Sequence, residues 1–78
     1  MDAFELAVQY NGRELSFPAR LLTMGYSYKI EVQVNAIQVL FEPDEERNYR
    51  AIVAESQREK IDVALLQIIA TALQQALQ

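Results

Sequence analysis

The chain contains no cysteine, histidine or tryptophan, and it has only two glycines and two prolines. Without cysteine or histidine it forms no disulfide, none of the common zinc sites, and no Cys–His or Ser–His catalytic pair. The lack of cysteine fits a reducing compartment, so we predict a cytoplasmic protein. Acid–base chemistry would fall to Asp, Glu, Tyr or Lys alone, and no pattern organises a nucleophile. We therefore expect no enzyme, no catalytic residue, no cofactor and no metal.

Positive charge is also scarce, because seven basic residues are scattered among eleven acidic ones and the formal net charge is −4. Nucleic-acid binders usually carry a clustered basic patch, so we expect no nucleic-acid partner. The first residues lack a basic segment followed by an apolar one, so we expect no signal peptide. Asp62 and Gln67 interrupt the longest apolar stretch, which argues against a membrane span. A length of 78 residues predicts a single domain, 1–78.

The first pattern is a β-hairpin. Residues 3–10 alternate apolar and polar side chains, which is typical of a half-buried strand, and residues 13–18 form the return strand. Asn11-Gly12 between them is the strongest short hairpin signal, because both residues tolerate positive φ. The predicted cross-strand pairs are Val8 with Leu15 and Leu6 with Phe17.

The segment 18–25, PARLLTMG, is ambiguous. Proline at a first helical position and glycine just past the end would suit one or two helical turns. An irregular crossover is an equal alternative. In either case we expect Leu21, Leu22 and Met24 to close one end of the core.

A longer hairpin follows, with strands over 26–34 and 37–42. Asn35-Ala36 forms its turn, where alanine is a poor occupant of a positive-φ position, so we expect strain or a different turn type. Val34 should pair with Ile37, Val32 with Val39, and Ile30 with Phe41. Leu40 breaks the pattern and faces outward beside Glu31, where it would contact a loop or a partner.

The third turn, 43–48, follows Glu42 and contains Asp44, Glu45 and Glu46. A calcium site is one interpretation, but the EF-hand spacing is absent, so we favour a solvated loop tip. The segment 49–54 is predicted to form a last short strand.

The only long helical pattern covers 57–77. Ser56 and Glu59 have the spacing of a capping box, and no glycine or proline follows. Its apolar arc is about 200° wide, whereas packing on one sheet needs a little over 100°. The surplus side must be covered by the chain's own strands and loops or by another subunit. That side comprises Leu66, Ala70, Leu73 and Leu77.

These elements predict an α+β fold: an antiparallel meander of about five strands (3–10, 13–18, 26–34, 37–42 and 49–54) with one C-terminal helix (57–77) packed on one face. A strand of nine residues and a helix of about twenty are each about 30 Å long, so the helix can lie along the long hairpin. Consecutive hairpins favour sequential neighbours in the sheet.

The segment IEVQVNAIQVLFEPDEERNYRAIV, 30–53, resembles the strand–turn–strand–acidic loop–strand core of short uncharacterised bacterial proteins. This resemblance covers about a third of the chain. It implies no activity, and no functional residue carries over from it.

Composition and pattern favour a small, non-enzymatic structural or protein-interaction module that self-associates as a homodimer. The alternative is a binder of small molecules or peptides that uses the open sheet face or a sheet edge. The predicted interface residues are Leu66, Ala70, Leu73, Leu77 and Leu40.

Overall fold

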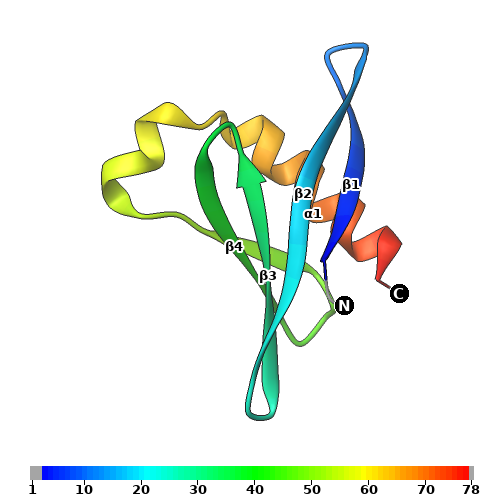
Figure 1. The fold of residues 1–78 in the computed structure, drawn as a ribbon, viewed down its shortest axis with the longest axis vertical. Helices are drawn as coiled ribbons and strands as arrows, with labels where there is room; N and C mark the ends of the chain where they lie inside the picture. The colour runs from blue at the N-terminus through cyan, green and yellow to red at the C-terminus, as the bar shows by residue number, and fades with distance from the viewer. Residues whose placement is uncertain (1–2, 78) are drawn as a thin grey trace.

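The computed structural model describes residues 3–77 and has the predicted α+β fold. One antiparallel sheet contains five strands in chain order, and a C-terminal helix lies against it (Figure 1). The elements are β1 (Ala3–Tyr10), β2 (Arg13–Met24), β3 (Ser27–Val34), β4 (Ile37–Pro43), β5 (Tyr49–Ile52), the 3₁₀ helix η1 (Glu55–Lys60) and α1 (Val63–Ala76).

The registers of the two predicted hairpins are confirmed. Val8 pairs with Leu15 across the first turn, and Val34 pairs with Ile37 across the second. Leu40 pairs with Glu31 on the face away from the helix, as its position in the pattern predicts. Alternation and turn length therefore determine which side chains enter the core.

The second turn keeps a strained geometry. Asn11 and Gly12 in the first turn have φ values of 53° and 75°, and Asn35 and Ala36 in the second have 50° and 69°. Positive φ at both central residues is the type I′ arrangement that suits the twist of a hairpin. Ala36 therefore occupies a left-handed conformation that costs an alanine about 1–2 kcal/mol. Of the two predicted outcomes, strain is the one found.

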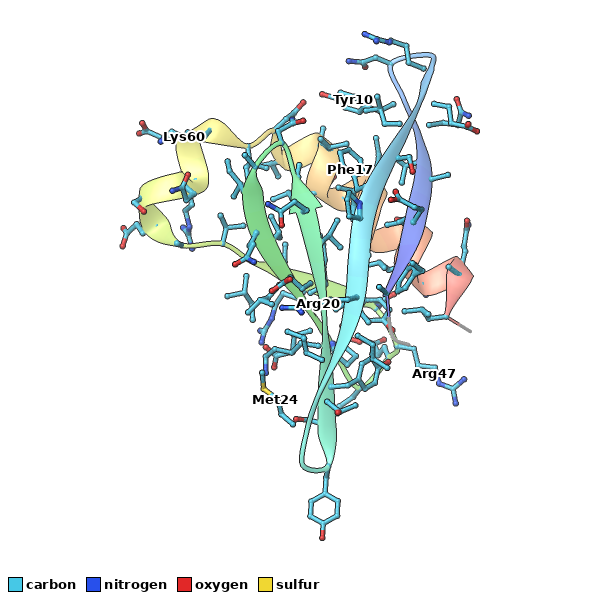
Figure 2. The ribbon with its side chains drawn as sticks, in the orientation of Figure 1. Tyr10, Phe17, Arg20, Met24, Arg47 and Lys60 are labelled. Atoms are coloured by element: carbon cyan, nitrogen blue, oxygen red, sulfur yellow. The ribbon has the colours of Figure 1, made fainter. Side chains whose placement is uncertain are left out.

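Segment 18–25 forms neither helical turns nor an irregular crossover. It continues β2 as far as Met24, and the chain then reverses over Gly25 and Tyr26 into β3. Gly25 has a φ of 64°, which permits this tight turn. Leu21 packs against the core as predicted, but Met24 is exposed near the tip of this third hairpin (Figure 2).

Pro18 limits how far β2 follows β3. The β2–β3 pairing begins at Ala19, opposite Val32, and does not extend toward Phe17. Met24 and Ser27 flank a two-residue turn and bond to each other, so alternate residues of β2 direct their N–H groups to β3. Residue 18 is one of the positions whose N–H would be directed to β3, but proline has no N–H to donate. The tip of the β1–β2 hairpin therefore separates from the tip of β3–β4, as Figure 1 shows.

The helix is shorter than the predicted 57–77, because α1 covers Val63–Ala76. Residues 55–60 form η1, whose start has no side-chain cap, so Ser56 does not cap the α-helix. Asp62 is the cap, and its Oδ1 accepts a hydrogen bond from the Ala64 N–H at 2.9 Å. Ile61 adopts an extended conformation between the two helices and is buried, and this interrupts the helical run.

The sheet curves around α1. In a flat sheet with strands about 4.8 Å apart, the two edge strands would be about 19 Å from each other. The helix nevertheless contacts both β1 and β5. Its buried residues Leu65, Ile69 and Leu73 lie in the concave face, where Ile30, Val32, Val39 and Phe41 are also completely buried.

Candidate functional site

An apolar groove lies between β5 and the helical segment. It holds about 330 Å³ and is open to solvent on one side. From β5 and the residue after it the groove is lined by Tyr49, Ala51 and Val53, and from the helical side by Arg58, Ile61, Val63, Leu66, Gln67 and Ala70. Most of these side chains are apolar, so the groove presents hydrocarbon surface beside a strand edge.

Val63 and Ile52 are large apolar residues that leave much of their surface in water. Val63, in the first turn of α1, is 65% exposed, and Ile52, at the end of β5, is 40% exposed. Val63 lines the groove, whereas Ile52 lies on the other face of the sheet opposite Leu40. Both faces beside the β5 edge therefore carry apolar surface, which is the feature expected of a contact region.

The β5 edge also carries unpaired backbone groups. Val34 and Ile37 flank a two-residue turn and bond to each other, and hydrogen-bonded pairs then alternate along the ladder. On this alternation Leu40 and Glu42 direct their backbone groups to Ile52 and Arg50 of β5. The Asp44 N–H donates to the Asn48 carbonyl at 2.8 Å, so the same alternation of hydrogen-bonded residues continues beyond Glu42.

It follows that Tyr49 and Ala51 direct their N–H and C=O groups away from β4. Val53, just after β5, has the same direction by this alternation. Within residues 3–77, β5 pairs with β4 alone. The three residues whose backbone faces outward are the same three whose side chains line the groove. An added strand would therefore find hydrogen-bonding groups and an apolar surface in one place.

The predicted interface residues do not form one surface. Leu66 and Ala70 line the groove, and both are half-buried. Leu73 is completely buried in the core, and Leu77 is 42% exposed near the end of the helix. Leu40 is half-buried on the opposite face of the sheet. The curved sheet covers much of the wide apolar arc, so the chain itself supplies the cover for Leu73.

The other edge of the sheet is more polar. Where β1 approaches α1, a shallow hollow is lined by Ala7, Val8 and Gln9 and by Ala64, Gln67, Ile68, Thr71, Ala72 and Gln75. Glu5 and Gln9 of this edge strand are exposed, and charged or polar edge residues discourage the addition of a strand. Of the two edges, β5 is the better contact site.

Tyr49, at the start of β5, lines the groove and is held by a second tyrosine outside it. The hydroxyls of Tyr28 and Tyr49 lie 2.8 Å apart and share a hydrogen bond. Burial and this bond raise the pKa of Tyr49 above its ordinary value of 10.0. Tyr49 is therefore neutral at physiological pH, and the shared hydrogen bond helps to position it at the strand edge.

The acidic turn serves a structural purpose. Oδ1 of Asp44 accepts hydrogen bonds from the N–H groups of Glu46 and Asn48, each at 2.9 Å. Arg47 completes the turn with a φ of 68°. Within residues 3–77 no three Asp or Glu side chains gather as a metal site would require. Glu42 pairs with Arg50 at 3.6 Å across the strands.

No family model, curated protein or solved structure matches the chain. The resemblance of residues 30–53 to short bacterial proteins therefore stays a prediction. Among residues 3–77, no helix has both the length and the apolar character needed to cross a membrane.

Sequence reasoning identified Leu66 and Ala70 and predicted a strand over 49–54, but it did not place that strand beside them. The direction of each backbone group in β4 follows from the two-residue turn at Asn35-Ala36. The longer turn, 43–48, concealed how that alternation passes to β5. Val63, which also lines the groove, was not among the predicted interface residues.

Proposed function

We propose that this chain is a small non-enzymatic interaction module that self-associates through the β5 edge and the adjacent groove. The observation that carries the proposal is the coincidence of the outward backbone groups of Tyr49, Ala51 and Val53 with the apolar groove. An uncovered strand edge presents unpaired N–H and C=O groups on which another chain can pair, unless charge, proline or a bulge blocks it. The groove side of β5 carries no charged side chain, since its charged residue, Arg50, faces the other side.

The first test is solution mass, measured by light scattering behind size exclusion over a range of concentrations. The wild-type chain should shift from monomer to dimer as its concentration rises. Val63→Glu should remain monomeric at concentrations where the wild type is dimeric, because it replaces apolar groove surface with a second charged side chain beside Arg58. Val63 is exposed and lies in the first turn of α1, where a carboxylate suits the helix dipole, so the variant should fold.

Met24→Glu is the matched control, because it adds the same charge away from the groove. Met24 is 51% exposed and lies near the tip of the β2–β3 hairpin. This variant should associate like the wild type. A wild-type chain that stays monomeric at every concentration would contradict self-association. Equal dimerisation of the two variants would move the interface away from the groove.

A peptide binder is the second candidate, because a strand from another protein could pair with the same free edge. The groove beside β5 would then hold alternate side chains of the peptide. Titration of apolar β-strand peptides, followed by the amide NMR shifts of Tyr49, Ala51 and Val53, tests this function. Shifts confined to other strands would exclude the β5 edge as the binding site.

Several features of this proposal rest on the sequence. The cytoplasmic location follows from the cysteine-free composition, and the absence of a nucleic-acid partner follows from the net charge of −4. Each stays a prediction. An assay panel for hydrolase activity on model esters and phosphate esters would test the non-enzymatic assignment.

A further inference from the structure

We propose that two copies of this chain pair β5 with β5 in one antiparallel register, in which Ala51 lies opposite Ala51 of the second copy. This inference rests on the proposed function and specifies its partner and geometry. A two-fold axis through such a contact would join the two sheets edge to edge, with the groove side chains of both copies on one face.

The direction of the backbone groups limits the possible registers. Two antiparallel strands exchange hydrogen bonds only between residues whose N–H and C=O groups face each other. On the free side these residues are Tyr49 and Ala51 of β5, and Val53 just beyond its end. Centring the axis on Ala51 pairs Tyr49 of each copy with Val53 of the other, so all three outward residues find partners.

The neighbouring registers are worse. An axis at Arg50 places two arginines directly opposite each other, and like charges in that position are destabilising. An axis at Ile52 pairs Ala51 with Val53, but Tyr49 then has none of the partner's outward-facing residues opposite it. Only the Ala51 register uses every outward group and separates the arginines.

The side chains agree with this register on both faces. On the groove face Tyr49 meets Val53, an aromatic and β-branched pair of the kind that stabilises neighbouring strands. On the other face Arg50 lies opposite Ile52, and its aliphatic stem can cover apolar surface that is 40% exposed in the single chain.

The chain contains no cysteine, so single-cysteine variants can determine the register. We would compare Arg50→Cys, Ala51→Cys and Ile52→Cys, with Gln38→Cys on exposed β4 surface as the control for random collision. Opposite α-carbons in a hydrogen-bonded pair are about 5.5 Å apart, which a disulfide can span. Residues 50 and 52 would each lie about 8 Å from their own counterparts, beyond disulfide reach.

In mild oxidising buffer, Ala51→Cys should form covalent dimers at least about tenfold faster than the other three variants. As a second measurement, a mixture of Arg50→Cys and Ile52→Cys should cross-link between the two variants faster than within either. This mixture keeps the test valid if Ala51→Cys does not fold.

The outcomes separate this inference from the proposed function. Dimers by solution mass with fastest cross-linking at Arg50→Cys or Ile52→Cys would overturn the register and leave self-association standing. Cross-linking no faster than in Gln38→Cys would have the same meaning. A chain that is monomeric at all concentrations would overturn both.

Discussion

The Tyr10 hydroxyl donates a hydrogen bond to Oδ2 of Asp62, a residue 52 positions further along the chain. The other carboxylate oxygen of Asp62 accepts the Ala64 N–H at the start of α1. One side chain therefore caps the helix and ties it to Tyr10, which Figure 2 shows near the tip of the β1–β2 hairpin. This link holds in place the hairpin tip that Pro18 separates from β3.

Replacing Asp62 with alanine should lower the midpoint of thermal unfolding by several degrees, because the helix loses its cap and the hairpin tip loses its link. Ser56→Ala is the control and should change the midpoint very little, since Ser56 makes no cap hydrogen bond. Circular dichroism during heating measures both. If Ser56→Ala were the more damaging change, the helix would begin at residue 57 rather than after Asp62.

Asp62 should also make stability depend on acid. The hydrogen bonds from Tyr10 and Ala64 lower the pKa of its carboxyl below its ordinary value of 3.8. A lowered folded-state pKa contributes stability that is complete above the ordinary carboxyl range and is lost as pH falls through the lowered value. Urea unfolding between pH 2 and pH 6 should therefore show a shallower acid limb in Asp62→Asn. An acid limb identical to wild type would contradict this role.

Alkaline pH should destabilise the fold through Tyr49. Its raised pKa means that the unfolded chain loses the phenolic proton first, so stability is complete below about pH 10 and falls above it. Tyr49→Phe should lose less stability between pH 9 and pH 11 than the wild type. Tyr26→Phe, at a fully exposed turn, should follow the wild-type curve. Chemical denaturation at each pH provides the comparison.

The strained turn offers a stabilising change. Ala36 has a φ of 69°, so Ala36→Gly should raise the free energy of unfolding by about 1 kcal/mol. The same substitution in a strand, Ala7→Gly, should lower it by about 0.5–1 kcal/mol. Urea titration distinguishes the two. A destabilising Ala36→Gly would show that the unfolded chain gains more freedom than the turn loses strain.

Leu73 and Leu77 should respond differently to truncation. Leu73→Ala should cost about 2–5 kcal/mol, because Leu73 is completely buried beneath the sheet. Leu77→Ala should cost less than about 1 kcal/mol, because Leu77 is 42% exposed near the end of α1. Similar losses in the two variants would mean that Leu73 is not in the core.

Local patterns predicted the hairpins because each pattern had one consistent solution. Alternation from residue 3 to residue 10 and Asn11-Gly12 agree on one register, and the same holds around Asn35. The segment after Pro18 had no single solution, because proline and glycine suit a short helix as well as a strand followed by a turn. The pairing of residues 19–24 with β3 decides between them.

The helix start and the contact surface depended on tertiary packing. Ser56 and Asp62 are both good N-cap residues. The burial of Ile61 selects Asp62, and only the folded chain reveals that burial. The angular pattern of the helix likewise placed Leu73 with Leu66, but the curvature of the sheet separates them into core and groove.

Every strand pairs with the strand that precedes or follows it in sequence, whereas α1 contacts β1 at the other end of the sheet. Protein synthesis delivers the strands first and the helix afterwards. Until α1 leaves the ribosome, no helix covers the concave face of a nascent sheet, and its apolar side chains remain exposed to solvent. The hairpins can form early because their contacts are local, but the finished core must wait for the helix. During that interval the growing chain is most vulnerable to wrong contacts, and docking of α1 ends it.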